Sequence, residues 1–313
     1  MTEEPKRRPV AKVPDLATPK IPGYKIECEL GRGTSGIVYR ASQISVDRQV
    51  ALKVMHLDRS INMRSVRRLQ REARIAAHLS HPNLISAIDM GQSGSFWWFA
   101  MELVEGPSLA ERLEKGGRLK ETEALILFSQ LCEALQHASE KGVVHRDIKP
   151  ANILLERPDL PRLADLGLAR IEDDPMLTRS GATLGTPHYI SPEQARDPGA
   201  ADARSDIWSL GATMYHSVCG RPPFSGTSTA EILSSVLYSP IPDPIELRPE
   251  LSRGLALVLR KCLSRNPDKR YFAAAEMRAD LALVAAHKAP AIKRGSLEPL
   301  DPTKGENRGM LMM

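Results

Sequence analysis

The 313-residue chain has few cysteines and no long apolar run, and both absences narrow the class of protein. Its four cysteines form no C-x-x-C pair and stand near no histidine at zinc-ligand spacing, so they are predicted to be reduced, mostly buried thiols. No 18 consecutive residues are all apolar, and the opening MTEEPKRRPV lacks the apolar segment of a signal peptide. We therefore expect neither secretion nor a membrane span, and a cytoplasmic location.

A large excess of one charge is also absent. The 43 Lys and Arg residues against 38 Asp and Glu give a net charge of +5, which helps to hold an anionic ligand but does not indicate nucleic acid as a partner. With 42% hydrophobic and 26% charged residues, the chain has the composition of an ordinary globular protein. No period of 20–50 residues repeats, which argues against a solenoid or a propeller. The length allows one large domain or two lobes that share a cleft.

The pattern of residues changes once along the chain. Residues 1–20 hold four prolines without a hydrophobic period, and residues 287–313 are similar, so both are predicted to be flexible extensions. Residues 24–104 are rich in alternating, β-branched segments, whereas residues 105–286 show helical periods such as ETEALILFSQLCEALQHASE. This change predicts a small β-rich lobe, with one helix at about residues 62–79, followed by a larger helical lobe.

Five strands are predicted in the first lobe. The segment IECELGRGTSGIVYRASQ predicts a strand, a glycine turn and a second strand, and Val50-Ala51-Leu52-Lys53 predicts a third after a polar turn. Residues 85–90 and 96–103 predict two more. A generic small barrel that binds no nucleotide is the alternative for this lobe.

Gly31, Gly33 and Gly36 form a G-x-G-x-x-G motif, in which backbone N–H groups can approach a polyphosphate without obstruction by a Cβ atom. In a dinucleotide-binding protein such a turn opens a helix. Here Ile37-Val38-Tyr39 continues a strand instead, because β-branched and aromatic residues favour extended structure. The motif therefore predicts a hairpin over phosphates, and a turn that merely needs glycines is the alternative.

Lys53 ends an apolar strand segment, where a lysine is unfavourable unless an anion lies nearby. In the predicted helix, Glu72 falls on the same face as Leu69, Ala73 and Ala76. A carboxylate on this inward face can pair with Lys53 and orient it toward phosphate oxygens. The alternative is an ordinary surface ion pair between Glu72 and a neighbouring arginine.

Two further motifs follow in the second lobe. His145-Arg146-Asp147-Ile148-Lys149-Pro150-Ala151-Asn152 lies between apolar stretches, and Asp165-Leu166-Gly167 comes after it. Protein kinases carry, in this order, a glycine-rich loop, a strand lysine, an H-R-D-x-x-x-x-N loop and a D-F-G motif. In this chain the matching residues follow in the same order: Gly31 to Val38, Lys53, His145 to Asn152 and Asp165 to Gly167. Over roughly residues 22–286 the chain resembles the eukaryotic-type protein kinases, and HPNL, GTPHYISPEQA and SDIWSLG look most like the bacterial serine/threonine kinases.

The resemblance implies an α+β, bilobal protein kinase fold. It would comprise a β-rich N-lobe with one main helix at residues 21–103 and a mainly helical C-lobe at residues 104–286. It also implies ATP and Mg²⁺ as cofactors, with Mn²⁺ as a possible substitute, and serine or threonine hydroxyls of proteins as acceptors. Self-phosphorylation in trans is a further expectation.

The resemblance also implies a role for individual residues. Asp147 would orient the acceptor hydroxyl and take its proton, Lys149 would contact the γ-phosphate, and Thr186 would hydrogen-bond both of them. Lys53 and Glu72 complete the expected catalytic set. Asn152 and Asp165 are the expected Mg²⁺ ligands, because this ion prefers oxygen donors.

The predicted nucleotide site draws on the glycine motif, the adjacent strands and the interlobe hinge. Adenine is expected to bond the Glu102 carbonyl and the Val104 backbone, beside the gatekeeper Met101. Plain core packing is the alternative for Met101 and Ala51 taken alone. The full set is Gly31, Arg32, Gly33, Thr34, Ser35, Gly36, Val38, Ala51, Lys53, Met101, Glu102, Val104, Asn152 and Asp165.

Three residues are expected to support the site without taking part in the chemistry. Glu193, in the place of the family's A-P-E motif, is expected to pair with Arg270, and Asp206 to hold the backbone of the catalytic loop.

Arg146 lies beside Asp147 in the sequence, and we expect an anion to balance its charge. A phosphate on the segment between Asp165 and Glu193 could supply that anion. The candidate hydroxyls are those of Thr178, Ser180 and Thr183, with a polar loop as the alternative for each.

Two substitutions depart from the family pattern. Leu166 replaces the phenylalanine of D-F-G, which changes packing but does not exclude activity. Ala151 stands where many arginine-directed kinases carry Glu, so no preference for basic substrate residues follows. The competing hypothesis is a pseudokinase or nucleotide-binding scaffold, and the presence of Lys53, Asp147, Asn152 and Asp165 favours the enzyme. A third hypothesis, a dinucleotide-dependent oxidoreductase, is excluded because the residues after the glycines predict a strand and not a helix.

Overall fold

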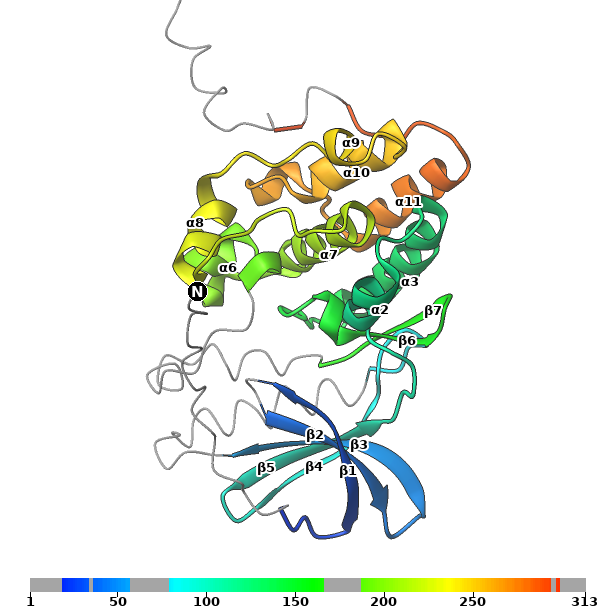
Figure 1. Cartoon of the computed structure of the whole chain (residues 1–313), viewed down its shortest axis with the longest axis vertical. Helices are drawn as coiled ribbons and strands as arrows, with labels where there is room; N and C mark the ends of the chain where they lie inside the picture. Colours follow the sequence, from blue (N-terminus) through cyan, green and yellow to red (C-terminus); the bar gives the residue numbers. More distant parts are fainter. Residues whose placement is uncertain (1–18, 34–35, 57–78, 166–186, 294–296, 299–313) are drawn as a thin grey trace, which may run out of the picture.

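The computed structural model describes residues 19–33, 36–56, 79–165, 187–293 and 297–298. A five-stranded sheet forms one lobe, and a larger, mainly helical lobe lies beside it (Figure 1). This arrangement confirms the predicted bilobal α+β fold. The helix predicted at residues 62–79 lies almost wholly outside the described residues.

The N-lobe sheet is antiparallel, with the strand order β1-β2-β3-β5-β4. Alternation of apolar residues places Ala41, Val50, Leu52 and Ala100 in one fully buried layer. All five predicted strands are present, and the third extends beyond the predicted segment at both ends. The strands are β1 (Tyr24–Gly33), β2 (Gly36–Gln43), β3 (Arg48–His56), β4 (Ala87–Ser93) and β5 (Phe96–Glu102).

The C-lobe is built around α7 (Ala203–Cys219), a helix with almost every side chain buried. Helix α3 (Glu121–Glu140) packs against α7 and against α11 (Ala274–Ala285), and α10 (Arg253–Cys262) contacts both α7 and α11. Leu131, Trp208, Tyr215 and Leu259 form the centre of this core and are fully buried. Helix α2 (Leu109–Gly116) begins at Ser108 with a capping box, in which Glu111 closes the reciprocal hydrogen bond.

Short elements complete the lobe and carry most of its loops. The hairpin is formed by β6 (Ile153–Arg157) and β7 (Leu160–Leu163). The short helices are α6 (Pro192–Arg196), α8 (Thr229–Tyr238) and α9 (Pro244–Leu247). The 3-10 turns are η1 (Pro150–Asn152), η2 (Pro187–Tyr189), η3 (Pro198–Ala200) and η4 (Pro267–Lys269).

The connection into β4 joins the sheet to the C-lobe hairpin. Leu84 forms a parallel bridge with Leu163, supported by backbone hydrogen bonds of 2.9 Å from Leu163 to Asn83 and 3.0 Å from Ile85 to Leu163. Asp165 follows β7 by two residues. The hairpin therefore fixes Asp165 close to the base of the N-lobe.

Part of the segment expected to be a flexible tail packs on the C-lobe. The Ala291 amide donates to the buried Asp280 carboxylate at 2.6 Å, Pro290 is buried, and Ile292 contacts the core. Further along, Glu298 accepts hydrogen bonds from the amides of Arg265 and Asn266 at 2.7 and 3.0 Å. These contacts extend the packed chain beyond residue 286.

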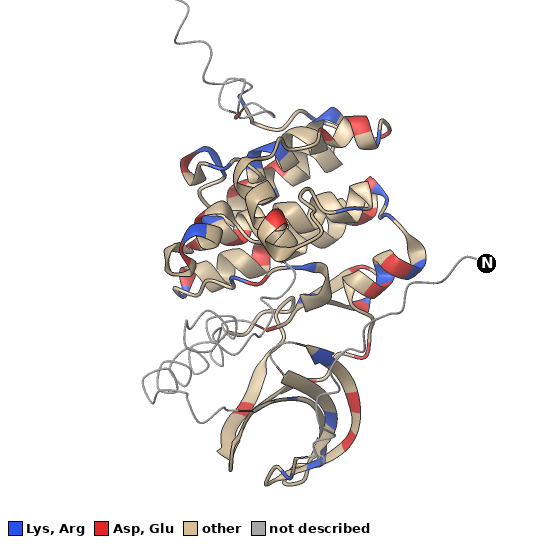
Figure 2. Ribbon diagram, turned by 60° about the vertical axis from the view of Figure 1, so that its left-hand side comes forward, with Lys and Arg blue, Asp and Glu red and all other residues tan. Residues whose placement is uncertain are grey.

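The state of the cysteines and the distribution of the charges match what the sequence predicts. All four cysteines are free, three of them are buried, and Cys28 is exposed. Acidic and basic residues are interspersed over both lobes (Figure 2). Within the described part of the chain, no helix combines the length and the apolar character that crossing a bilayer requires.

Candidate active site between the two lobes

The loop from His145 to Asn152 is held from behind by Asp206 of α7. The two Asp206 carboxylate oxygens accept hydrogen bonds from the backbone amides of His145 and Arg146, at 2.7 and 2.8 Å. Burial raises the pKa of Asp206, while His145 and the two amides lower it. Arg146 has a φ of +71°, a left-handed conformation that a non-glycine residue keeps only where its surroundings impose it. The predicted support by Asp206 is thus confirmed.

Asp147, Lys149 and Asn152 form one polar cluster at the end of this loop. The Lys149 ammonium lies 2.7 Å from Asp147 Oδ2. Asn152 Nδ2 donates to the same oxygen and to the Asp147 carbonyl, both at 2.8 Å. Asn152 is buried, whereas Asp147 and Lys149 are partly exposed. The cluster therefore presents an oriented and partly exposed carboxylate.

Lys53 connects the sheet to the C-lobe. Its side chain, only 5% exposed, forms an ion pair with Asp165 Oδ2 at 3.0 Å. Asp165 has a φ of +63°, which turns the chain after β7. Glu72, the predicted partner of Lys53, lies outside the described residues.

The register of the sheet places four predicted nucleotide-binding residues on one face. Val38 pairs with Lys53 across β2 and β3, and Ala51 pairs with Met101 across β3 and β5. Ala51 and Lys53 are two residues apart and therefore point to the same side. Because Lys53 reaches Asp165, this face is the one turned toward the C-lobe.

The glycine motif forms the predicted hairpin between β1 and β2, where Gly33 pairs with Gly36. Gly36 has a φ of +138°, and a Cβ there would lie 2.4 Å from the Val54 carbonyl oxygen, so the fold itself requires this glycine. Among the described residues, a Cβ at Gly31 or Gly33 would meet no atom within 4 Å. Packing against the described part of the chain therefore does not explain these two glycines.

The remaining residues of the predicted nucleotide-binding set lie on the surface, in a connection between elements, or outside the described residues. Arg32 pairs with Glu29 on the exposed surface of β1, and Val104 follows β5 in the connection to α2. Thr34, Ser35 and Thr186 lie outside the described residues. The candidate phosphorylation sites Thr178, Ser180 and Thr183 also lie outside them.

Glu193 and Arg270 form the predicted ion pair. Their hydrogen bonds measure 2.6 and 2.7 Å, and Ser205 donates a third to Glu193 at 2.7 Å. Burial alone raises the pKa of Glu193, but the hydrogen bonds and charge of Arg270, together with Ser205, lower it to about 2. Glu193 therefore stays ionised inside the C-lobe.

Two connections to the site were not predicted from the sequence. Arg162 of β7 binds the Glu102 carboxylate at the end of β5, Glu156 at 2.6 Å and the Leu84 carbonyl at 3.3 Å. Gln194 donates to the Arg146 carbonyl at 3.1 Å. An arginine inside the short apolar strand LPRL is the one signal that could have indicated the first; nothing local indicates the second.

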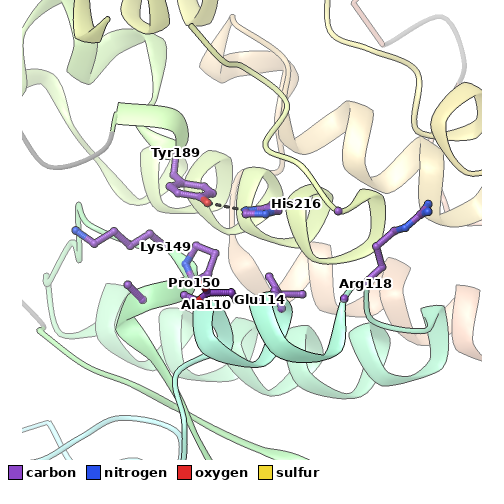
Figure 3. Close-up of a pocket in the computed structure, with 11 residues that line it drawn as sticks. Ala110, Glu114, Arg118, Lys149, Pro150, Tyr189 and His216 are labelled. Carbon is purple, nitrogen blue, oxygen red and sulfur yellow. Dashed lines mark hydrogen bonds between the residues drawn. The ribbon is translucent and has the colours of Figure 1, made fainter. Parts of the chain in front are cut away.

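A pocket of about 600 Å³ lies beside the loop from His145 to Asn152, between α2, η1, η2 and α7 (Figure 3). We call it the α2–α7 pocket. Tyr189 OH lies 2.7 Å from His216 Nδ1, and their rings stack. Burial raises the pKa of Tyr189, whereas burial and His188 lower that of His216. The lining residues are Ala110, Leu113, Glu114, Gly117, Arg118, Lys149, Pro150, Ala151, Tyr189, His216 and Gly220.

Comparison with known proteins gives matches over most of the chain. Residues 24–280 match the family described as protein kinase domain. The serine/threonine-protein kinase PrkC of Bacillus subtilis is 36% identical over 82% of this chain and 40% of its own length. The serine/threonine-protein kinase PknB of Mycobacterium leprae is 37% identical over 85% of this chain and 44% of its own length.

A solved structure shares the fold. The kinase domain of Mycobacterium tuberculosis PknI, crystallised as a point mutant, has 27% sequence identity and a TM-score of 0.68. The match covers 85% of this chain and 96% of that domain. The chain spans less than half the length of PrkC and PknB. These matches show that the chain belongs to the protein kinase domain family, of the bacterial serine/threonine type.

Proposed function

We propose that the chain is an active protein kinase, which transfers the γ-phosphoryl group of ATP to serine and threonine hydroxyls of proteins. The observation that carries this proposal is the Lys53–Asp165 ion pair, at 3.0 Å, beside the cluster of Asp147, Lys149 and Asn152. A cation from the N-lobe and the oxygens proposed to bind a metal in the C-lobe thus lie near one another, which supports the proposal. Phosphoryl transfer depends on such positioning of charge.

The donor set fits Mg²⁺ held together with the phosphates of a nucleotide. Among the described residues, no three His, Cys, Asp or Glu side chains lie close enough to form a metal cage. Mg²⁺ usually needs only one or two protein oxygens when phosphates supply others, and Mn²⁺ accepts similar ligands. Asp165 would provide a carboxylate. Asn152 uses its Nδ2 hydrogens for Asp147, so its Oδ1 would bind the metal, which stabilises the charge of the phosphates.

Asp147 is the proposed base. It would accept the hydroxyl proton of the substrate as the new bond from that oxygen to the γ-phosphorus forms and the bond from this phosphorus to the β–γ bridging oxygen breaks. ADP leaves with that oxygen. Lys149, held by Asp147, supplies a positive charge next to the transferred group. Glu72 and Thr186 keep their proposed roles of orienting Lys53 and the Asp147–Lys149 pair.

The nucleotide would lie against the sheet face that carries Val38, Ala51, Lys53 and Met101. Adenine would bond the backbone at Glu102 and Val104, with the glycine hairpin over the phosphates. Gly31 and Gly33 support this placement, since packing against the described residues does not require them. An apolar pocket with a few polar groups is typical of cofactor sites.

The test measures transfer of labelled γ-phosphate, with Mg²⁺ or Mn²⁺, to the chain itself and to a generic basic protein. Wild type should label both, and Lys53→Met, Asp147→Asn and Asp165→Asn should lose at least about 10²-fold. Lys288→Met, an exposed lysine far from the cleft, is the matched control. If wild type incorporates no more label than these variants, the chain is a scaffold and not an enzyme.

We also propose a cytoplasmic location and self-phosphorylation in trans at Thr178, Ser180 or Thr183. Support for self-phosphorylation comes from the placement of Arg146. This residue is held next to Asp147, in a left-handed conformation, at the start of the proposed catalytic loop. Active chain mixed with Lys53→Met chain should label the inactive one, and mass spectrometry should find phosphate within residues 172–184. Absence of label on the inactive chain would contradict transfer between molecules.

A further inference from the structure

We propose that the α2–α7 pocket receives an apolar side chain of the substrate peptide, at a position near the phosphorylated serine or threonine. This inference rests on the kinase function proposed above and adds a substrate preference to it. The occupant follows from the position of the pocket and from the chemistry of its walls.

The pocket is continuous with the catalytic loop. Lys149, which lies 2.7 Å from Asp147 Oδ2, also lines the pocket, and Pro150 and Ala151 follow it directly. A peptide whose hydroxyl reaches Asp147 must therefore pass the mouth of the pocket. Since an extended peptide advances about 3.3 Å per residue, the side chain that enters belongs to a residue near the acceptor.

The inner walls are apolar or neutral. Ala110 and Leu113 come from α2, Pro150 and Ala151 from η1, and Tyr189 presents a ring from η2. The Tyr189 hydroxyl and His216 Nδ1 share a hydrogen bond, so these two polar groups already satisfy each other. Burial, together with the neighbouring His188, lowers the pKa of His216 and so favours its neutral form.

The charged groups lie at the edges. In Figure 3, Lys149 extends away from the Tyr189–His216 pair on one side, and Arg118 lies at the other end of the pocket. Glu114 and Arg118 are exposed residues of opposite charge, and the Lys149 ammonium is bound to Asp147. A cationic substrate side chain would leave water for a site without an inward carboxylate, whereas an apolar side chain loses no hydrogen bond. The walls therefore favour leucine, methionine or phenylalanine.

The experiment scans a set of serine and threonine peptides in which each position near the acceptor is in turn Leu, Phe, Arg or Glu. At one position, kcat/KM should be about tenfold higher with Leu or Phe than with Arg or Glu. Ala110→Met fills the pocket and should remove this preference. Ala151→Glu adds a carboxylate and should shift the preference to Arg at the same position.

Matched controls use an exposed alanine of α11, outside the pocket. Ala279→Met and Ala279→Glu introduce the same side chains on that helix and should keep the wild-type profile. Glu114→Gln removes the only carboxylate of the lining and should also leave the apolar preference in place. Phosphorylation of a generic basic protein by Ala110→Met and by Ala279→Met shows that transfer itself is intact.

A binding readout separates this inference from the proposed function. Without nucleotide, the Leu peptide should shift the NMR methyl signals of Ala110, Leu113 and Ala151 in the full chain, and the Arg peptide should shift them less. These shifts without any phosphoryl transfer would support the pocket and contradict the kinase activity. Transfer with a flat profile, or with Arg or Glu preferred, would overturn the inference, as would the absence of methyl shifts.

Discussion

Arg270 donates two hydrogen bonds, of 2.6 and 2.7 Å, to the two carboxylate oxygens of Glu193, 77 residues earlier in the chain. Its remaining donors bond the carbonyls of Ser264, Arg204 and Arg265, and its guanidinium lies over the ring of Trp208. All five N–H groups of the arginine are thus satisfied, and its side chain is fully buried. The pair ties the segment after η2 to the end of the C-lobe.

Removal of Glu193 should therefore destabilise the whole C-lobe. Glu193→Gln leaves the buried Arg270 charge without its counterion, and we expect the free energy of unfolding to fall by about 3–5 kcal/mol. Urea unfolding followed by circular dichroism measures this change. Glu133→Gln is the control, because Glu133 pairs with Arg278 at the surface and should cost less than about 1 kcal/mol. An equal loss in the free energy of unfolding in the two variants would show that the buried pair stabilises the protein no more than a surface pair does.

The same carboxylate predicts a pH dependence. The pKa of Glu193 in the folded protein is about 2, below its ordinary value of 4.5. A lowered pKa stabilises the folded state fully above pH 4.5, and this stabilisation, about 3 kcal/mol, is lost as the pH falls from 4.5 to 2. The stability difference between wild type and Glu193→Gln should shrink across this window. A difference that does not change with pH would contradict the assignment.

Asp206 should affect turnover more than nucleotide binding. Asp206→Asn turns an amide N–H₂ toward one of the backbone amides of His145 and Arg146, so the loop that carries Asp147 should shift. We expect kcat to fall by about 10²-fold, with little change in KM for ATP. Asp280→Asn is the matched control, since Asp280 is equally buried but bonds Tyr271 and Ala291 away from the cleft. Equal losses of kcat in both variants would indicate general destabilisation.

Features set by local pattern or by a motif could be predicted from the sequence. The strands of the N-lobe follow from their alternation, and the β1–β2 hairpin from the residues after Gly36. The pairing of Glu193 with Arg270 followed from the family resemblance, which supplied a contact that spacing alone does not. The packing of Ala291 and Glu298 on the C-lobe was missed, because a proline-rich, polar segment has no periodicity that reveals its contacts.

Contacts between distant elements could not be predicted. Arg162 meets Glu102 only because the parallel bridge at Leu84 brings β7 to the end of β5. The α2–α7 pocket likewise combines four separate elements, and His216 belongs to none of the motifs found in the sequence. Such sites depend on how helices pack against one another. Hydrophobic periodicity predicts which face of a helix is buried, but not which residues of two helices meet.

Arg162 should act on the proposed nucleotide site through the hinge at the end of β5. Its guanidinium joins Glu102 to Glu156, and Glu102 also accepts a hydrogen bond from the Ser86 amide at 3.1 Å. Arg162→Met removes this bridge, so the backbone proposed to bind adenine loses its anchor. We expect a several-fold weaker nucleotide affinity by calorimetry with Mg²⁺, and a loss of about 1–3 kcal/mol in stability.

The control for this prediction lies in the same hairpin. Arg157 of β6 forms an exposed pair with Asp159, and Arg157→Met should change neither nucleotide affinity nor stability measurably. Because both substitutions remove one positive charge, a general electrostatic effect on ATP would weaken binding in both variants. Weaker binding in Arg162→Met alone would assign the effect to the position of the hinge. Unchanged affinity in Arg162→Met would mean that the contacts between β4, β5 and the C-lobe hold the hinge without this arginine.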